Sequence, residues 1–187
     1  MPADRPVLIE LVTDPGAAAE IAFVAAVTFP LACPPHSTRE NIAAHLAGSL
    51  TPEHFAHWIT GDDHDVLVAR DGRGGPPIGY SLIGYGPPAD PAVRDALPGG
   101  RAVEVSKMYV LPDHHGTGRG ARPSHLLMAA ALDAGRARGA ESAWLGVNQL
   151  NARALTYYRK MGFAVAGTRS FDMNGAVEHD YVMVRGL

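Results

Sequence analysis

A glycine-rich segment in the middle of the chain has the residue types of an anion-binding loop. The β-branched and aromatic stretch 103–111 (VEVSKMYVL) is followed by Pro112-Asp113 and then by residues 115–121 (HGTGRGA). Three alternating glycines let successive backbone N–H groups point into one concavity, because no Cβ blocks the turn. The positive end of the helix expected after this loop favours the same ligand. The pattern predicts a binding site for a pyrophosphate.

Two other kinds of phosphate-binding loop fit this segment less well. A P-loop ends in Gly-Lys-Ser/Thr, whereas this loop continues as Gly-Arg-Gly-Ala. The dinucleotide fingerprint GxGxxG/A is formally met by Gly116, Gly118 and Ala121. That fingerprint also requires an acidic residue at the end of the following strand, and Glu141 precedes the strand instead. A dinucleotide site is therefore the disfavoured alternative.

A second motif lies downstream, at residues 151–163 (NARALTYYRKMGF). Together with the glycine loop it resembles the acetyl-CoA-dependent N-acetyltransferases of the GNAT superfamily. In that superfamily a Q/R-x-x-G-x-G/A loop precedes an N-x-x-A-x-x-F/Y-Y-x-x-x-G-F motif. Both motifs occur here in the same order, separated by one expected helix and one expected strand. The resemblance implies the GNAT fold, acetyl-CoA as co-substrate, and transfer of its acetyl group to a primary amine.

The resemblance also indicates which residues hold acetyl-CoA. Backbone groups of the strand before the loop are expected to pair with the pantetheine arm and to polarise the acetyl carbonyl. The loop would bind the pyrophosphate, and the second motif would contribute its asparagine, a tyrosine and a lysine. The expected cofactor-binding residues are Met108, Tyr109, Val110, His115, Gly116, Thr117, Gly118, Arg119, Gly120, Ala121, Asn151, Tyr158 and Lys160.

The loop departs from the family pattern in two places. His115 stands where Arg or Gln is usual, which removes a permanent charge or an amide and leaves its backbone to bind. The segment after Gly120 is longer than the pattern and contains Pro123. Proline is accepted in the first turn of a helix, so we expect the helix to begin near Arg122. Arg122 is a further candidate for a phosphate contact.

Two side chains are expected to carry the reaction. The attacking amine must be neutral, although an alkylammonium has a pKa of about 10, so a base has to remove a proton. Glu104 lies where many relatives carry a carboxylate and is expected to be that base, directly or through water. Tyr158 matches the family tyrosine that protonates the departing thiolate, and its neighbour Tyr157 is expected to pack. A solvated glutamate and a core tyrosine are the ordinary alternatives.

A closer resemblance concerns the acceptor. The segments 144–147 (WLGV), 157–163 (YYRKMGF), 167–175 (GTRSFDMNG) and 37–46 (STRENIAAHL) are similar to bacterial spermine/spermidine N-acetyltransferases of the Pai type. This likeness implies a polyamine acceptor. It is shared in part with protein-acetylating relatives, so a protein N-terminus or a lysine is the second candidate. An acyl-CoA-binding regulator without turnover is the third.

Other reactive residue types are assigned no role in the chemistry. Cys33 has no His-Asp partners at a suitable spacing, and direct attack by an amine needs no acyl-enzyme. His54 and His57 are three residues apart on an expected helix, but no third ligand is evident, so no metal site is predicted.

Composition sets the remaining limits. The 187 residues fit one domain, taken here as residues 1–187, and 47% hydrophobic with 19% charged residues is typical of a globular protein. A net charge of −3 argues against nucleic acid as a partner. A single cysteine, the absence of a secretory signal, and no apolar run near about 20 residues argue for the cytoplasm and against a membrane partner. The expected partner is a small-molecule amine, and a homodimer is possible.

The expected elements alternate so that a mixed α/β sheet with helices on both faces is the natural packing. Pro30 is expected to end the first helix. The helical insert at residues 30–60 is expected near the acceptor site. The strands are predicted at 6–13, 65–70, 78–85, 103–111, 142–147, 163–171 and 177–185, and the helices at 16–28, at 37–46 with its cap at Ser37, at 51–58, 92–97, 126–138 and 151–161.

Overall fold

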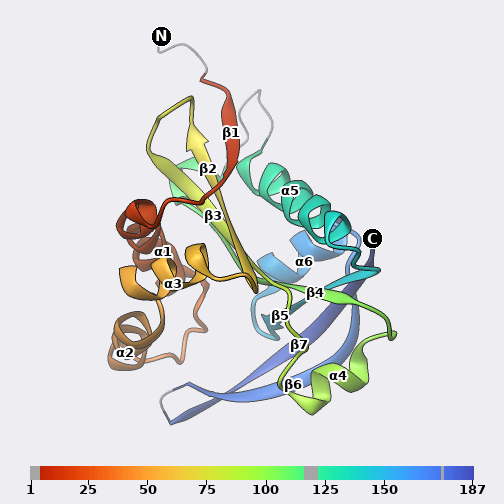
Figure 1. Ribbon diagram of the computed structural model, residues 1–187. Helices are drawn as coiled ribbons and strands as arrows, with labels where there is room; N and C mark the ends of the chain where they lie inside the picture. Colours follow the sequence, from red (N-terminus) through yellow and green to blue (C-terminus); the bar gives the residue numbers. More distant parts are fainter. Residues whose placement is uncertain (1–4, 116–121, 174) are drawn as a thin grey trace.

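A single mixed sheet forms the centre of the protein (Figure 1). The computed structural model describes residues 5–115, 122–173 and 175–187. Seven strands follow the order β1-β2-β3-β4-β5-β7-β6, and every neighbouring pair is antiparallel except β4 and β5. The strands are β1 (Val7–Leu11), β2 (His64–Asp71), β3 (Pro77–Gly84), β4 (Ala102–Val110), β5 (Ser142–Asn148), β6 (Ala164–Met173) and β7 (Ala176–Gly186).

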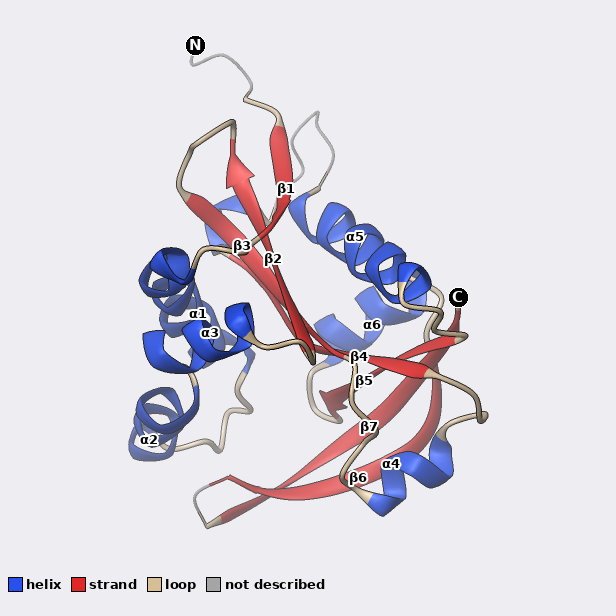
Figure 2. Ribbon diagram, in the orientation of Figure 1, coloured by secondary structure: helices blue, strands red, loops and turns tan. Residues whose placement is uncertain are grey.

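Helices cover both faces of this sheet, which confirms the predicted fold class (Figure 2). Helices α1 to α3 lie on one face of strands β2 to β4, and α5 and α6 lie on the other. The short α4 packs against β6. The helices are α1 (Ala18–Ala32), α2 (Arg39–Ser49), α3 (Pro52–Thr60), α4 (Pro91–Ala96), α5 (Pro123–Ala137) and α6 (Ala152–Lys160), with 3-10 turns at Pro15–Ala17 and Pro112–His114.

Two apolar cores hold these layers together. Leu127 and Met128 of α5 are fully buried against the sheet in the first core. Ile21 and Val24 of α1 and Phe55 of α3 are fully buried against the opposite face in the second. Strands β2 to β4 are thus covered on both sides, and their backbone provides a rigid support for the residues between the two cores.

The sheet is interrupted between its two parallel strands. Strands β4 and β5 pair only from Ala102↔Ser142 to Glu104↔Trp144, although each strand continues well beyond that point. Beyond the last pair, β4 stays with β3 while β5 follows β7. A gap therefore opens in the middle of the sheet, and it has unpaired backbone groups along its edges.

A bulge in β4 sets which side chains face each core. The register shifts between Leu82 and Ile83, so Ser106 is an extra residue opposite β3. Val105 and Met108, three residues apart, consequently both pack in the α5 core. In an unbroken strand, residues with this spacing would point to opposite faces.

Two local predictions for the first helices were wrong. Helix α1 continues through Pro30 and ends at Ala32, because the proline lies within the last turn, where one lost hydrogen bond is offset by packing of the buried face. The cap of α2 is Thr38 rather than Ser37, and its hydroxyl accepts a hydrogen bond from the Asn41 N–H at 3.2 Å. The other elements lie within a few residues of their predicted bounds.

The segment Pro15–Ala32 also corrects the statement about apolar runs. Its 18 residues have a mean hydropathy of 1.5, which is long and apolar enough for a membrane span by length and composition alone. One side of the helix is nevertheless buried: Ile21, Val24 and Ala25 have no exposed surface. A core helix passes the same test, so this feature alone is weak evidence for a membrane partner.

Gly79 offers a direct test of the tight packing beneath β4. A Cβ added there would lie 2.7 Å from the Tyr109 carbonyl oxygen and 3.0 Å from Val110 Cγ2. We expect Gly79→Ala to lower the free energy of unfolding by about 1–3 kcal/mol, measured by urea denaturation. The control is Gly48→Ala in α2, where no atom lies within 4 Å. That change should stabilise the helix by about 0.5–1 kcal/mol. Equal effects of the two substitutions would contradict this account.

Candidate active site

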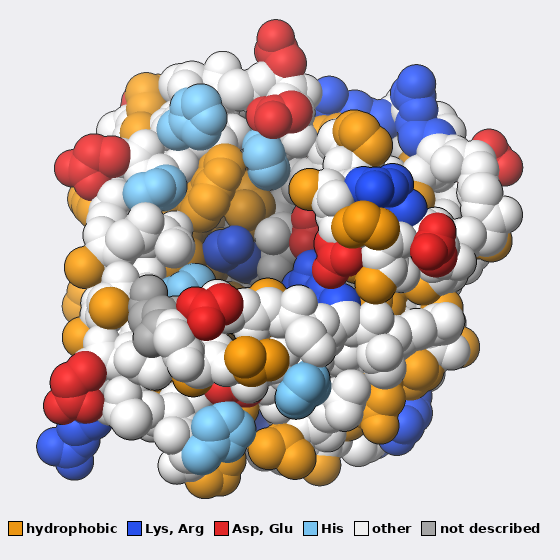
Figure 3. Space-filling model, turned by 90° about the horizontal axis from the view of Figure 1, so that it is seen from below, with side chains coloured by type: hydrophobic (Ala, Val, Ile, Leu, Met, Phe, Trp, Pro, Cys, Tyr) orange, Lys and Arg blue, Asp and Glu red, His pale blue; other side chains and the backbone are white. Residues whose placement is uncertain are grey.

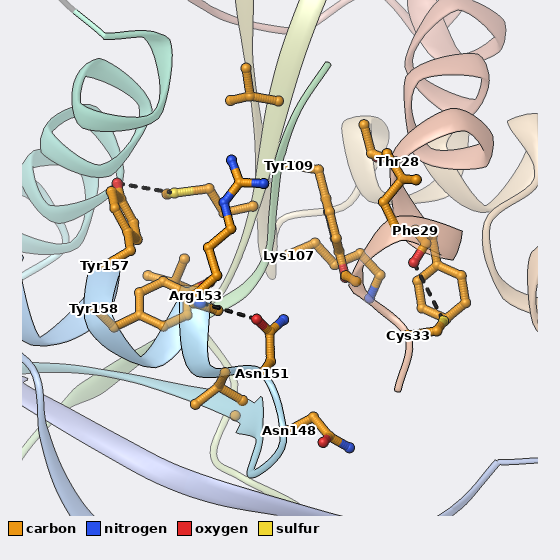
Figure 4. A pocket seen from close by; sticks show the side chains of 18 of the residues that line it. Thr28, Phe29, Cys33, Lys107, Tyr109, Asn148, Asn151, Arg153, Tyr157 and Tyr158 are labelled. Carbon is orange, nitrogen blue, oxygen red and sulfur yellow. Dashed lines mark hydrogen bonds between the residues drawn. The ribbon is translucent and has the colours of Figure 1, made fainter. Parts of the chain in front are cut away.

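The gap between β4 and β5 opens into a cavity of about 740 Å³. In Figure 3 it is the hollow near the centre of the face seen from below, with charged groups inside it and histidines around it. It runs from the first turn of α5 and the exposed side of α6 to the end of α1 and the inner face of β6 and β7. Figure 4 shows labelled side chains from α1, β4, β5 and α6 around one space.

The edge of β4 presents two of the three expected backbone groups to the cavity. The Leu111 N–H donates to the Ile78 carbonyl at 2.8 Å, so the backbone of every second residue before it, including Tyr109, also points toward β3. The backbone groups of Met108 and Val110 point the other way, into the gap. All three residues line the cavity.

His115 lies at the end of this edge. Its Nε2 atom donates a hydrogen bond to the Val110 carbonyl oxygen at 2.6 Å, so that carbonyl is already occupied. Burial lowers the pKa of the His115 imidazole, and Arg153 lowers it further. The ring therefore does not replace the permanent charge of the usual arginine. Val110 keeps only its N–H for a ligand.

The first turn of α5 has the features of an anion site. The helix begins at Pro123 with Arg122 as its N-cap, as predicted, and no side chain of the described residues caps it. Pro123 has no N–H and the His125 N–H donates to the Arg122 carbonyl at 2.9 Å, so Ser124 has the open N–H of the first turn within the described part of the chain. Arg122, Ser124 and His125 line the cavity at this point. The predicted loop residues Gly116, Thr117, Gly118, Arg119, Gly120 and Ala121 lie outside the described residues.

Helix α6 supplies the opposite wall. The Asn151 side chain accepts a hydrogen bond from the Ala154 N–H at 3.0 Å and so caps the helix, as predicted. Asn151 and Lys160 both line the cavity. Arg153 lines it too, and the sequence analysis did not single it out. Arg153 has helical spacing to Tyr157 and Lys160, which line the same cavity, and this spacing could have identified it from the sequence.

Tyr158 and Tyr157 have different surroundings. The Tyr157 hydroxyl donates to the Ser124 carbonyl at 2.7 Å, which ties α6 to the start of α5. The Tyr158 ring packs against Phe163 and Tyr157 and lines the cavity. Among the described residues, its hydroxyl has no hydrogen-bond partner, so it is available to a ligand. Burial, followed by Tyr109 and Tyr157, raises the Tyr158 pKa far above its usual value, so the phenol keeps its proton.

The Tyr109 side chain also lines the cavity, although the sequence analysis assigned a role only to the backbone there. Its ring stacks on Tyr80, with ring centroids 5.8 Å apart, and lies between Tyr158 and Cys33 in Figure 4. Burial raises its pKa far above the usual value, and the nearby Cys33 and Asp180 raise it further. The cavity lining therefore includes three protonated phenols, those of Tyr109, Tyr157 and Tyr158, and the sequence analysis assigned a catalytic role to Tyr158 alone.

Glu104 does not line the cavity. Its carboxylate is partly buried near Gly84, where an added Cβ would lie 3.6 Å from Oε2. Burial raises the pKa of this carboxyl group, while Arg169 and Lys107 oppose the shift. Both of these cations do line the cavity. Glu104 is therefore one side chain removed from the cavity, and its role as a general base stays a prediction.

Lys107 is a charged group that the sequence analysis missed. It lies in the cavity, with its Nζ 5.1 Å from the centre of the Trp58 ring. Burial lowers the pKa of this ammonium and Arg169 lowers it further, whereas Glu104 opposes the shift. The bulge at Ser106 accounts for its direction, and no sequence pattern signalled that bulge.

The acidic residues of the cavity come from β7. Glu178 and Asp180 are 3% and 5% exposed, and both line the cavity. Asp180 Oδ2 accepts hydrogen bonds from Arg169 Nε at 3.3 Å and Nη2 at 3.2 Å. Burial raises the Asp180 pKa, and Arg169 opposes that shift. Glu178 and Asp180 are two residues apart and so lie on one face of β7, and this spacing could have identified them from the sequence.

The predicted helical insert contributes to the same end of the cavity. His45 of α2 lines it, together with Phe29 and Cys33 at the end of α1. The Phe29 and His45 rings stack with centroids 4.5 Å apart. Within residues 5–115, 122–173 and 175–187, no group of three or more His, Cys, Asp or Glu is arranged to hold a metal ion.

Comparison with known proteins agrees with this geometry. Residues 31–163 match the acetyltransferase (GNAT) family model. An uncharacterized N-acetyltransferase of Mycobacterium tuberculosis is 43% identical over 169 residues, which cover 90% of this chain and 96% of that protein. A streptothricin acetyltransferase of Streptomyces lavendulae is 42% identical over 66 residues, 35% of this chain and 33% of that protein.

A solved structure of similar fold is the PaiA N-acetyltransferase from Thermoplasma acidophilum in complex with coenzyme A. Its TM-score is 0.71 at 16% identity, covering 96% of this chain and 99% of that one. The chain belongs to the GNAT acetyltransferase family. It is an N-acetyltransferase that depends on an acyl-CoA.

Cys33 allows a direct test of the environment at the far end of the cavity. Its S–H donates to the Phe29 carbonyl at 3.4 Å, and burial followed by Glu178 raises the pKa of the thiol to about 11. We expect iodoacetamide at pH 9 to alkylate it about 50-fold more slowly than an exposed thiol, because the thiolate is the reactive form. It is the only cysteine, so mass spectrometry reports it directly. A rate equal to that of an unfolded control would contradict the expectation.

Proposed function

We propose that this protein transfers the acetyl group of acetyl-CoA to a primary amine of a polyamine, through a ternary complex. The observation that supports this proposal is the separation of charge along one cavity. Of the five lysine and arginine residues that line it, Arg122, Arg153 and Lys160 lie at α5 and α6. Arg169 is paired with Asp180, and Lys107 lies over the Trp58 ring. The two acids of the cavity, among the described residues, lie together on β7. An anionic co-substrate and a cationic acceptor fit opposite ends.

The basic end has the groups that coenzyme A requires. The N-terminal end of α5 with the Ser124 N–H, together with the cation Arg122, suits a pyrophosphate. The unpaired backbone edge at Met108 and Val110 suits the amide groups of a pantetheine arm. These features belong to the chain itself, and the expected contacts of residues 116–121 would add to them.

Acetyl-CoA supplies the acetyl group as a thioester. The amine nitrogen forms a bond to the acetyl carbon, the carbon–sulfur bond breaks, and the departing thiolate takes a proton. Tyr158 is proposed to donate that proton, and two observations support this: it lines the cavity, and burial raises its pKa so that the phenol keeps its proton. The N–H groups of Met108 and Val110 would stabilise the charge that develops on the acetyl oxygen.

Glu104 is proposed to take up the proton that the acceptor loses, through water. Its carboxylate does not reach the cavity directly, but the cavity residues Lys107 and Arg169 lie next to it. A relay through this cluster fits better than direct abstraction. The same proposal includes a single domain over residues 1–187, a cytoplasmic location and a homodimeric assembly.

The proposal is tested by measuring the release of CoA thiol with spermine, spermidine, monoamines, amino acids and peptides. Turnover that favours polyamines supports it. Turnover only with peptides would replace it with the protein-acetylating function. Binding of acetyl-CoA without turnover on any acceptor would replace it with a regulatory role.

Tyr158→Phe removes the proposed acid and keeps the ring. We expect kcat to fall by about 10²-fold or more, with the Kd for acetyl-CoA changed by less than about threefold. Steady-state kinetics and isothermal titration measure the two quantities. Tyr157→Phe, which removes a hydroxyl bound to Ser124, is the matched control and should keep most of kcat. An unchanged kcat in Tyr158→Phe would remove the assignment.

Glu104→Gln tests the relay through a pH profile. Burial raises the pKa of Glu104 in the folded protein. As pH falls, the carboxylate is therefore protonated, and lost as a base, at a pH above the usual carboxyl range. We expect the variant to lose about 10²-fold in kcat near neutral pH and to lack that acidic limb. Glu53→Gln on the exposed side of α3 is the control. If the pH profile of kcat in Glu104→Gln keeps the acidic limb of the wild-type protein, Glu104 is not the base.

A further inference from the structure

Glu178 is a buried carboxylate that the proposed reaction does not use. It is 3% exposed and lines the acceptor end of the cavity. One oxygen, Oε1, is 2.9 Å from His36 Nε2, and the other, Oε2, accepts a hydrogen bond from Asn148 Nδ2 at 2.9 Å. These partners come from the segment after α1 and from the end of β5.

The charge of Glu178 is incompletely matched. Among the described residues, neither a lysine nor an arginine lies within ion-pair distance of it, and the His36 side chain is 54% exposed. The neighbouring acid Asp180, in contrast, is paired with Arg169 at 3.2 Å. Its two hydrogen-bond partners are an amide and a histidine that is charged only when protonated, so no permanent cation among the described residues neutralises it. Burying a charge is costly unless it is paired, so a cation of a ligand in the cavity would stabilise this carboxylate.

Glu178 and Tyr158 line the cavity from different elements. Glu178 belongs to β7 and contacts His36, which follows α1 and Cys33 in the chain, whereas Tyr158 belongs to α6. Figure 4 shows the Tyr109 side chain between Tyr158 and Cys33. A group bound at Glu178 would therefore lie on the α1 side of the cavity, and the nitrogen acetylated near Tyr158 on the α6 side.

We propose that Glu178 binds a second, distal ammonium group of the acceptor and thereby selects diamines and polyamines over monoamines. This inference rests on the proposed function and assigns its specificity to one residue. An alkylammonium with a pKa of about 10 stays charged at neutral pH and forms charge-assisted hydrogen bonds with a carboxylate. Each Glu178 oxygen has a further lone pair to accept them. His36 and Asn148 hold the carboxylate in place when no acceptor is bound.

The test compares linear α,ω-diaminoalkanes with n-alkylamines of the same carbon number. Wild-type protein should show a higher kcat/KM for the diamines, with a maximum at one chain length. In Glu178→Gln, kcat/KM for the best diamine should fall by about 10- to 100-fold, mainly through KM. The values for the matched monoamine should change by less than about threefold. Glutamine keeps the size of the side chain and one acceptor oxygen, but it removes the charge and replaces the other acceptor by a donor.

His36→Ala separates binding from a structural role. It breaks the contact between the segment after α1 and β7 while leaving the carboxylate in place. If Glu178 only ties these elements together, both variants should lose activity equally on diamines and monoamines, and the proposal is wrong. If Glu178 binds the ammonium, His36→Ala should keep the preference for diamines that Glu178→Gln loses.

Failure of the proposed function is distinguished by a binding experiment. If wild-type protein acetylates no polyamine, calorimetric titration of the best-fitting diamine into protein saturated with CoA still tests Glu178. If the Kd for the diamine is about tenfold or more higher in Glu178→Gln than in wild-type protein, the site is supported even though the reaction is different. Absence of binding to wild-type protein, or equal binding to both proteins, would overturn the inference.

Discussion

The separation of β4 from β5 is the constraint on which the rest of the site depends. Three residue pairs hold the parallel strands together, and beyond Glu104 and Trp144 each strand follows its other neighbour. In a continuous sheet, the backbone groups of Met108 and Val110 would be satisfied by β5. Because the strands part, these groups are open to a ligand, apart from the Val110 carbonyl that His115 contacts, and the side chains of both halves of the sheet face a common cavity.

The two halves of the sheet then supply different chemistry. Strand β4 and helices α5 and α6 provide backbone donors, a helix N-terminus and cations. Strands β6 and β7 provide the acids and the arginine that pairs with one of them. Gly146 on β5 makes room for this pair, since an added Cβ would lie 2.3 Å from Arg169 Nη2 and 2.9 Å from Asp180 Oδ2. Arg122, Arg153 and Lys160 thus line one side of the cavity, and Glu178 with the Arg169–Asp180 pair lines another.

Burial controls the protonation states within this cavity. It raises the pKa of the phenols of Tyr109 and Tyr158 and lowers that of the Lys107 ammonium. A phenol that keeps its proton can donate it but cannot act as a base. The carboxylates of Glu104 and Asp180 are shifted upward by the same desolvation, and nearby cations oppose the shift in each case. Burial therefore favours the protonated phenols, whereas the nearby cations favour the charged form of the two carboxylates.

The sequence by itself determined the features that depend on local order. Period-two apolar runs and turn residues located the strands, and Pro123 placed the start of α5 correctly. The motif at 151–163 identified the cap Asn151 and the cavity residue Tyr158, because cap and tyrosine lie on one short helix. Only the tertiary structure decided the surroundings of Glu178. Asn148 meets Glu178 because β7 lies beside β5, and His36, 142 residues away in the sequence, reaches it from the segment between α1 and α2. Lys107 reaches the cavity through a bulge at Ser106. Strand order and register fix such contacts, and both are set by packing of the whole sheet rather than by neighbouring residues.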